Sequence, residues 1–94
     1  MAMVRVTSFL SGRVQGVGMR YAVHDLSRQF AVRGFVQNLQ DGRVQILAEG
    51  EREEIDRFLN RLREVAPGVI QELESFTSTA TGEYSRFEIR REEF

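Results

Sequence analysis

The chain has 94 residues, 41% of them hydrophobic, which is enough for a single domain over residues 1–94 with one modest core. Its formal net charge of −1 and its lack of cysteine exclude a basic nucleic-acid-binding surface, disulfides and thiolate metal sites. No apolar run approaches the roughly 20 residues that span a bilayer, so we predict a cytoplasmic protein that binds neither membrane nor nucleic acid.

The N-terminal segment predicts a half-buried β-strand. Its side chains alternate with a period of two, with Val4, Val6, Ser8 and Leu10 on one face and Arg5, Thr7, Phe9 and Ser11 on the other. The strand leads into a glycine-rich connection.

This connection, the glycine loop of residues 12–20, contains three of the eight glycines and ends in Arg20. No Ser, Thr, Asp or Asn stands between Gly16 and Arg20 to cap the N–H groups at the start of the next helix. Glycines let the backbone approach a ligand closely, and the helix dipole adds partial positive charge. The loop is therefore either a tight strand-to-helix connection or a binding site for a small anion.

Two amphipathic segments predict helices. Residues 20–33 place their apolar side chains on one helical face, and Gly34 stands where a glycine commonly ends a helix. Residues 51–65 carry glutamates in the first turn and arginines towards the end, and Pro67 and Gly68 stop this second helix.

Between the helices, residues 34–49 predict two strands joined at Asp41-Gly42. A two-residue turn would pair Leu39 with Val44 and Asn38 with Gln45, placing Phe35, Leu39, Val44, Ile46 and Ala48 on one face. A four-residue turn from Leu39 to Gly42 would alter the pairs near the tip. In either case we expect Asn38 near the end of its strand on a solvated face.

Residues 69–77 predict a fourth strand, and residues 84–90 predict a short last one. The order β-α-β-β-α-β with a tight central hairpin indicates an α+β fold, the ferredoxin-like sandwich, in which two helices cover one face of an antiparallel sheet and a short C-terminal strand follows. This fold alone does not determine function.

Few residues in the chain could carry chemistry. His24 is the only histidine, and Asp25, Asp41 and Asp56 lie in separate elements, so we predict no metal site and no Ser-His-Asp relay. What remains is Arg20 beside the loop N–H groups, with Asn38 on the next strand. A carboxamide can orient a water but cannot serve as a general base, and phosphoryl transfer is the reaction class that tolerates this.

Two segments of the chain then carry a family resemblance. Gly12-Arg13-Val14-Gln15-Gly16-Val17-Gly18-Met19-Arg20 and Gly34-Phe35-Val36-Gln37-Asn38 resemble the two signature segments of the acylphosphatases, small enzymes with this fold. The resemblance extends to Asp41-Gly42-Arg43-Val44, Ala48-Glu49-Gly50, the second helix and Phe87-Glu88-Ile89.

The resemblance implies hydrolysis of a small carboxyl phosphate to a carboxylate and inorganic phosphate, without metal or cofactor. Separately, we expect the protein to be a monomer. Arg20 matches the arginine that binds the phosphate, and Asn38 matches the residue that positions the attacking water. The phosphate-binding backbone N–H groups match those of Gln15, Gly16, Val17, Gly18, Met19 and Arg20. Met19 stands where a phenylalanine is usual and Gln37 where a basic residue is common, and neither departure touches this chemistry.

Two other functions fit parts of the sequence. A non-catalytic ferredoxin-like module could bind a small anion or a phosphorylated partner through the same loop. An RNA-binding sheet is a third interpretation, although the charge is unfavourable, and Phe9 and Phe35 are the residues that would test it. Turnover of a synthetic acyl phosphate distinguishes the enzyme from the non-catalytic module.

Overall fold

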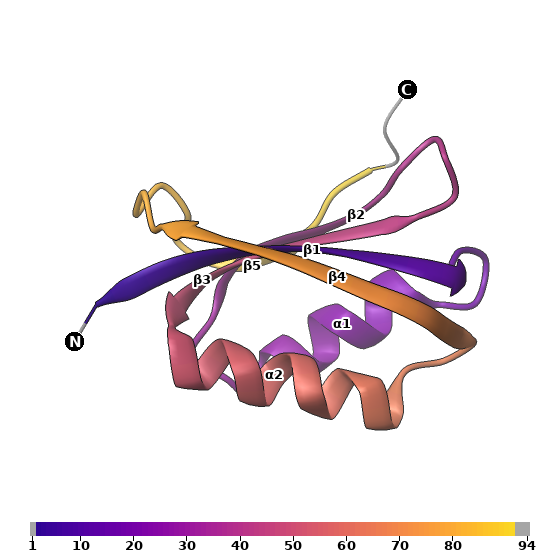
Figure 1. The fold of residues 1–94 in the computed structure, drawn as a ribbon, viewed down its shortest axis with the longest axis horizontal. Helices are drawn as coiled ribbons and strands as arrows, with labels where there is room; N and C mark the ends of the chain where they lie inside the picture. The colour runs from indigo at the N-terminus through magenta and orange to yellow at the C-terminus, as the bar shows by residue number, and fades with distance from the viewer. Residues whose placement is uncertain (1, 92–94) are drawn as a thin grey trace.

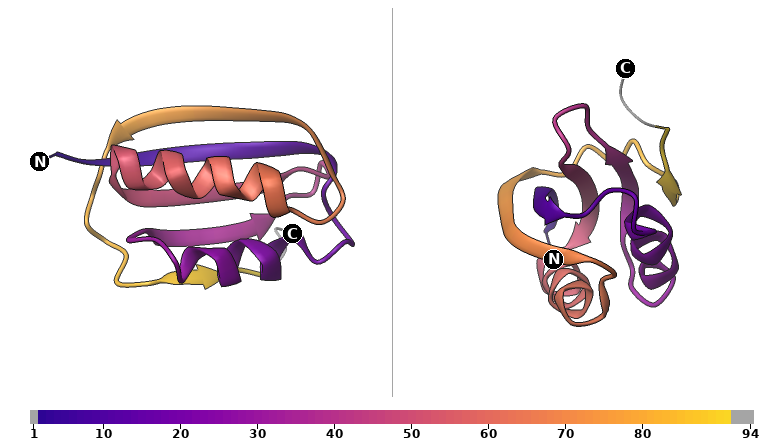
Figure 2. Two further views of the ribbon diagram at one scale, coloured as in Figure 1. Left: turned by 90° about the horizontal axis from the view of Figure 1, so that it is seen from below. Right: turned by 90° about the vertical axis from the view of Figure 1, so that its right-hand side faces the viewer.

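The computed structural model describes residues 2–91, which form a five-stranded sheet with two helices on one face (Figure 1). The elements are β1 (Met3–Arg13), α1 (Met19–Ser27), β2 (Arg33–Asn38), β3 (Val44–Glu51), α2 (Arg52–Val65), β4 (Val69–Thr79) and β5 (Phe87–Ile89). The strand order is β4-β1-β3-β2-β5. Helix α1 packs against β2 and β5, and α2 packs against β1 and β3 (Figure 2).

The predicted fold class is confirmed. The β1–β3, β1–β4 and β2–β3 pairs are antiparallel, as the ferredoxin-like sandwich requires. The short C-terminal strand β5 lies beside β2 and runs parallel to it, which makes the sheet mixed. Neither helix has the length and apolarity needed to cross a membrane.

The alternation predicted for β1 is present. Val6, Ser8 and Leu10 are buried on the helix-covered face. Ser8 is a polar residue in this row, and its hydroxyl is satisfied by a 2.8 Å hydrogen bond with the hydroxyl of Ser75 on β4. A half-buried strand therefore leads into the glycine loop, as the sequence indicates.

Helix α1 is shorter than predicted, because it ends at Ser27 and not at Arg33. Met19, Val23 and Leu26 are buried, with the helical spacing that anchors one face. The N–H groups of residues 28–30 donate to carbonyls three residues earlier, so the chain winds more tightly than an α-helix as it leaves the element.

Gly34 does not end the helix, and that prediction is wrong. It lies within β2 with a φ of +145°, and a Cβ at this position would lie 1.8 Å from the carbonyl oxygen of Leu47 on β3. A glycine is needed here because the backbones of the two strands approach closely.

The β2–β3 hairpin has the four-residue turn. The Gly42 N–H donates to the Leu39 carbonyl at 3.2 Å, and the Leu39 N–H donates to the Arg43 carbonyl at 2.9 Å. Asn38 consequently pairs with Val44, so the predicted pairs of a two-residue turn are wrong. Relative to a two-residue turn, the β2–β3 pairing is shifted by one residue. Each side chain of β2 therefore shares a face with the other set of β3 side chains.

Helix α2 covers the core on the sheet face that it shares with α1. Its buried residues are Ile55, Phe58, Leu59 and Leu62. Val65, the last residue of the helix, is 45% exposed. Phe58 lies at the centre of the core and contacts Phe30 and Phe87, with ring centroids 5.8 Å away in each case.

The other face of the sheet is partly covered by its own side chains. The Arg90 guanidinium lies 3.8 Å from the centroid of Phe35, which also contacts Tyr84 and is 4% exposed. Arg43 lies 4.6 Å from the centroid of Phe9. Phe35 is therefore not available to stack on a base, which weakens the RNA-binding interpretation.

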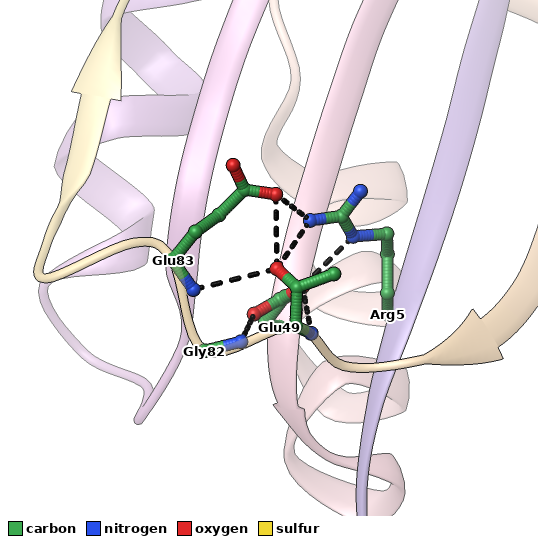
Figure 3. Close-up of polar contacts among 5 residues, drawn as sticks. Arg5, Glu49, Gly82 and Glu83 are labelled. Atoms are coloured by element: carbon green, nitrogen blue, oxygen red, sulfur yellow. Dashed lines mark hydrogen bonds and ion pairs between the residues drawn. The ribbon is translucent and has the colours of Figure 1, made fainter.

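A polar cluster, the Glu49 cluster, consists of Arg5, Glu49, Thr81, Gly82 and Glu83 (Figure 3). The Glu49 carboxylate is 5% exposed and accepts hydrogen bonds from Arg5 Nε at 2.8 Å and from the N–H groups of Thr81 and Gly82 at 2.9 and 3.0 Å. Burial alone would raise the pKa of Glu49, but these donors together lower it below its ordinary value. The cluster fastens the β4–β5 connection to the sheet.

Candidate active site

The glycine loop turns the chain from β1 into α1 and leaves its amides exposed to a ligand. Gly16 and Gly18 have φ values of +73° and +83°, which only glycine adopts readily. Gly18 is the N-cap of α1 and provides no side-chain hydrogen bond. Within residues 2–91, no acceptor is found for the N–H groups of Gln15 to Arg20. The predicted absence of a capping side chain is confirmed.

Four of these residues, Gly16, Gly18, Met19 and Arg20, border a small pocket of about 110 Å³, which Val14, Tyr21 and Asn38 also line. Its inner wall is formed by buried side chains, because Val14 is fully buried and Met19 is 2% exposed. Among residues 2–91, the lining contains no carboxylate, so a bound anion meets a helix N-terminus and a guanidinium without a facing negative charge from this part of the chain.

Arg20 is in the first turn of α1, at the edge of the pocket. Its Nη1 donates to the backbone carbonyl of Arg90 at 3.1 Å, which ties the side chain to the segment that follows β5. A guanidinium has five N–H donors in a fixed plane, so one such bond orients the group and leaves donors for an anion. The hydrogen bond thus limits the directions that Arg20 can take.

Asn38 reaches the same pocket from the end of β2. It is 6% exposed and pairs with Val44, in the row of residues that faces the helices. The expectation of a solvated face is therefore wrong, because the four-residue turn moves Asn38 to the helix-covered side. Its position at the strand end is as predicted.

The sequence did not indicate the role of the Gln15 side chain. Its Nε2 donates to the carbonyl oxygens of Leu39 at 2.8 Å and Arg43 at 2.9 Å, which flank the tip of the β2–β3 hairpin. Gln15 therefore joins the glycine loop to the strand end that carries Asn38. A lone carboxamide among the apolar and glycine residues of positions 14–19 was the available signal.

The structure brings Arg20, the glycine amides and Asn38 together at one end of the sheet, where the β1–α1 and β2–β3 connections lie side by side (Figures 1 and 2). Val17 belongs to the loop but packs against the core instead of lining the pocket. In the part of the chain that the structure describes, no group of three or more His, Cys, Asp or Glu side chains is placed to hold a metal ion.

Comparison with known proteins identifies the family. The family model described as acylphosphatase matches residues 6–89. The chain belongs to the acylphosphatase family. It is 42% identical to an acylphosphatase of Methanospirillum hungatei, over 73% of this chain and 76% of that protein. It is 37% identical to one from Acaryochloris marina, over 87% of this chain and 88% of that protein.

Solved structures agree with this assignment. The acylphosphatase of Bacillus subtilis superposes with a TM-score of 0.86 at 32% identity, covering 93% of this chain and 98% of that one. The predicted fold, family and acylphosphatase activity are therefore confirmed, and the non-catalytic module is not favoured. The roles of the individual site residues of this acylphosphatase rest on its geometry.

Proposed function

We propose that this acylphosphatase hydrolyses small carboxyl phosphates with a water positioned by Asn38, on a phosphoryl group held by Arg20 and the backbone amides of Gln15 to Arg20. The observation that supports the proposal is that one pocket brings together a guanidinium, a glycine-lined helix N-terminus and a buried carboxamide. Together they match what an in-line phosphoryl transfer needs, which is charge stabilisation and positioning.

Binding begins with the phosphoryl oxygens. Backbone N–H groups at a helix start point towards an anion, and the helix dipole adds favourable charge. Arg20 adds a planar set of donors whose direction is limited by the Arg90 carbonyl. These interactions stabilise the equatorial oxygens, on which charge is spread in the transition state.

The reaction itself forms one bond and breaks one. The water oxygen bonds to phosphorus, the bond between phosphorus and the acyl oxygen breaks, and its electron pair leaves with the carboxylate. Because a carboxylate is a stable anion at neutral pH, the leaving group needs no general acid. The proton of the attacking water passes to the phosphate product or to solvent, and Asn38 orients the water through its carboxamide without taking that proton.

A steady-state assay with a synthetic acyl phosphate, with and without a chelator, tests the proposed function. We expect release of carboxylate and phosphate at the same rate in both conditions. If phosphate binds but no turnover occurs, the non-catalytic module replaces the enzyme. If the chelator abolishes turnover, a metal is part of the mechanism and the proposal of a cofactor-free reaction fails.

Arg20→Gln tests the phosphate site directly. We expect loss of inorganic phosphate binding in calorimetry and a fall in turnover of at least about a hundredfold, because one transition-state donor is typically worth that much. Arg63→Gln, on the exposed surface of α2 outside the pocket, is the matched control for loss of one arginine. Unchanged phosphate affinity in Arg20→Gln would contradict the proposed site.

We further propose that the protein is a monomer in the cytoplasm, without nucleic acid as a partner. The lack of cysteine is compatible with a reducing compartment, and the net charge of −1 is unfavourable for binding a polyanion. Sedimentation of the purified protein, cell fractionation and salt-dependent titration with RNA test these three statements.

A further inference from the structure

The size of the pocket limits how much of the substrate it can enclose. Its volume of about 110 Å³ is well below the roughly 300 Å³ at which pockets begin to enclose whole ligands. A phosphoryl group fills such a space, so the carbon atoms of the acyl group must lie outside it.

The in-line reaction determines where the acyl group leaves the pocket. The attacking water and the leaving oxygen occupy opposite sides of phosphorus. Asn38, which is 6% exposed, lies on the interior side, so the acyl group projects towards solvent across the rim of the pocket.

In the part of the chain that the structure describes, Tyr21 is the exposed side chain at this rim. Among the lining residues, Val14, Met19 and Asn38 are buried, and Gly16 and Gly18 have no side chain. Arg20 is half-buried, and the proposed function assigns it to the phosphate. Tyr21 is 69% exposed, and within residues 2–91 its ring has no aromatic or cationic partner.

The local geometry directs Tyr21 to the same place. It is the third residue of α1, and helical side chains tilt towards the N-terminus, so its side chain is directed towards the turn that would hold the phosphoryl group, in agreement with its place in the pocket lining. An exposed aromatic ring gains contact area at low entropic cost when a flat apolar group lies against it.

We infer that Tyr21 is a specificity-determining residue of this acylphosphatase, which stacks on the acyl group and favours acyl phosphates with a flat, aromatic acyl group over those with a short chain. The inference rests on the proposed function, because it assumes that the phosphoryl group occupies the pocket. It names the substrate class that the rim selects.

The test compares kcat/KM for benzoyl phosphate with kcat/KM for acetyl phosphate in the wild-type protein, in Tyr21→Ala and in Tyr21→Phe. We expect the ratio to favour benzoyl phosphate in the wild type and to fall about two- to tenfold in Tyr21→Ala, the range typical of an aromatic pair. Tyr21→Phe keeps the ring, so it should keep the ratio.

Phe76→Ala is the matched control, because it removes another exposed aromatic ring, 56% exposed on β4 and outside the pocket. Its ratio should equal that of the wild type. An unchanged ratio in Tyr21→Ala, or a fall in Tyr21→Phe as large as in Tyr21→Ala, overturns the stacking role while the enzyme itself remains active. A wild-type protein that hydrolyses neither substrate overturns the proposed function, and the role of Tyr21 with it.

Discussion

At position 38, in the mechanism that we propose, a single carboxamide determines whether the site orients water or only binds an anion. Asn38 is buried at the end of β2 and lines the pocket beside Arg20. It cannot gain a proton at neutral pH, so the contribution that we propose for it is geometric. The effect of its removal should therefore appear in turnover much more than in phosphate affinity.

We expect Asn38→Ala to lower kcat by about a hundred- to a thousandfold, equivalent to about 2.7–4 kcal/mol of barrier, with phosphate binding retained. Steady-state kinetics and calorimetry measure the two quantities. Gln37→Ala is the control, because this neighbouring carboxamide lies on the opposite face of β2 and outside the pocket. Turnover near the wild-type value in Asn38→Ala would exclude the residue from the mechanism.

Gln15 is a second single residue on which the site depends, although its side chain does not line the pocket. Its two hydrogen bonds to the hairpin tip position the loop amides relative to Asn38. Gln15→Leu leaves the Leu39 and Arg43 carbonyls without this donor, and we expect kcat to fall about tenfold while KM changes less.

A double-mutant cycle separates this positioning role from a merely structural one. If Gln15 acts by aligning the loop with Asn38, Gln15→Leu should cost much less turnover in the Asn38→Ala background than in the wild type. Additive losses would assign Gln15 to stability alone, which urea unfolding of each variant would reveal independently.

At the scale of elements, the β2–β3 hairpin supplies Asn38 to the pocket, and the close pairing of its two strands depends on Gly34. The absence of a side chain there allows the backbone to approach Leu47, where a Cβ would lie 1.8 Å from a carbonyl oxygen. A larger residue must push the strands apart. The displacement would pass along β2 to Asn38 at its other end.

Gly34→Ala should therefore destabilise the fold by at least about 2–3 kcal/mol, from steric overlap added to backbone strain. Gly42→Ala is the matched control in the same hairpin, because Gly42 also has a positive φ, +95°, but a Cβ there meets nothing within 4 Å. It should cost only about 1–2 kcal/mol. Urea unfolding gives both values, and equal losses would refute the close-approach argument.

The elements also show what the sequence could and could not predict. Periodicity located β1, α2 and, to within one residue, the start of α1. The end of α1 was not predictable from the pattern, because it depends on whether the backbone forms i→i+3 or i→i+4 hydrogen bonds. The hairpin register was not predictable either, because it depends on whether the turn has two or four residues. The family motifs placed Arg20 and Asn38, but burial of Asn38 and the bonds of Gln15 required the structure.

At the scale of the whole molecule, the Glu49 cluster stabilises the end of the sheet opposite the pocket. In the β2–β3 ladder, Glu49 pairs with Arg33 at one end, and Asn38 pairs with Val44 at the other end. The cluster joins β1, β3 and the β4–β5 connection (Figure 3). Its charge is retained in the folded state because the donors lower the pKa of Glu49.

The lowered pKa of Glu49 makes the stability of the fold depend on pH. A carboxylate with a pKa lower in the folded than in the unfolded state contributes stability above the ordinary value of 4.5, and this contribution is lost as the pH falls through the lower folded value. Glu49→Gln should cost about 1.5–3 kcal/mol at pH 7, and the difference from the wild type should shrink below about pH 4.5.

Urea unfolding of both proteins at pH 7 and at pH 3.5 to 4 measures this difference. Glu83→Gln is the control, since Glu83 is 56% exposed and an exposed ion pair contributes little to stability. A difference between Glu49→Gln and the wild type that does not depend on pH would show that the charge of Glu49 does not stabilise the fold.

The use of backbone donors in the glycine loop affects which substitutions the site can tolerate during evolution. In the proposed site most donors are backbone N–H groups. Every amino acid except proline supplies such a group, whatever its side chain. Nucleotide changes at Gln15 or Val17 can replace the side chain and leave the amide in place. Drift in this stretch should consequently spare phosphate binding more often than drift at Arg20, provided that Gly16 and Gly18, with φ values of +73° and +83°, persist.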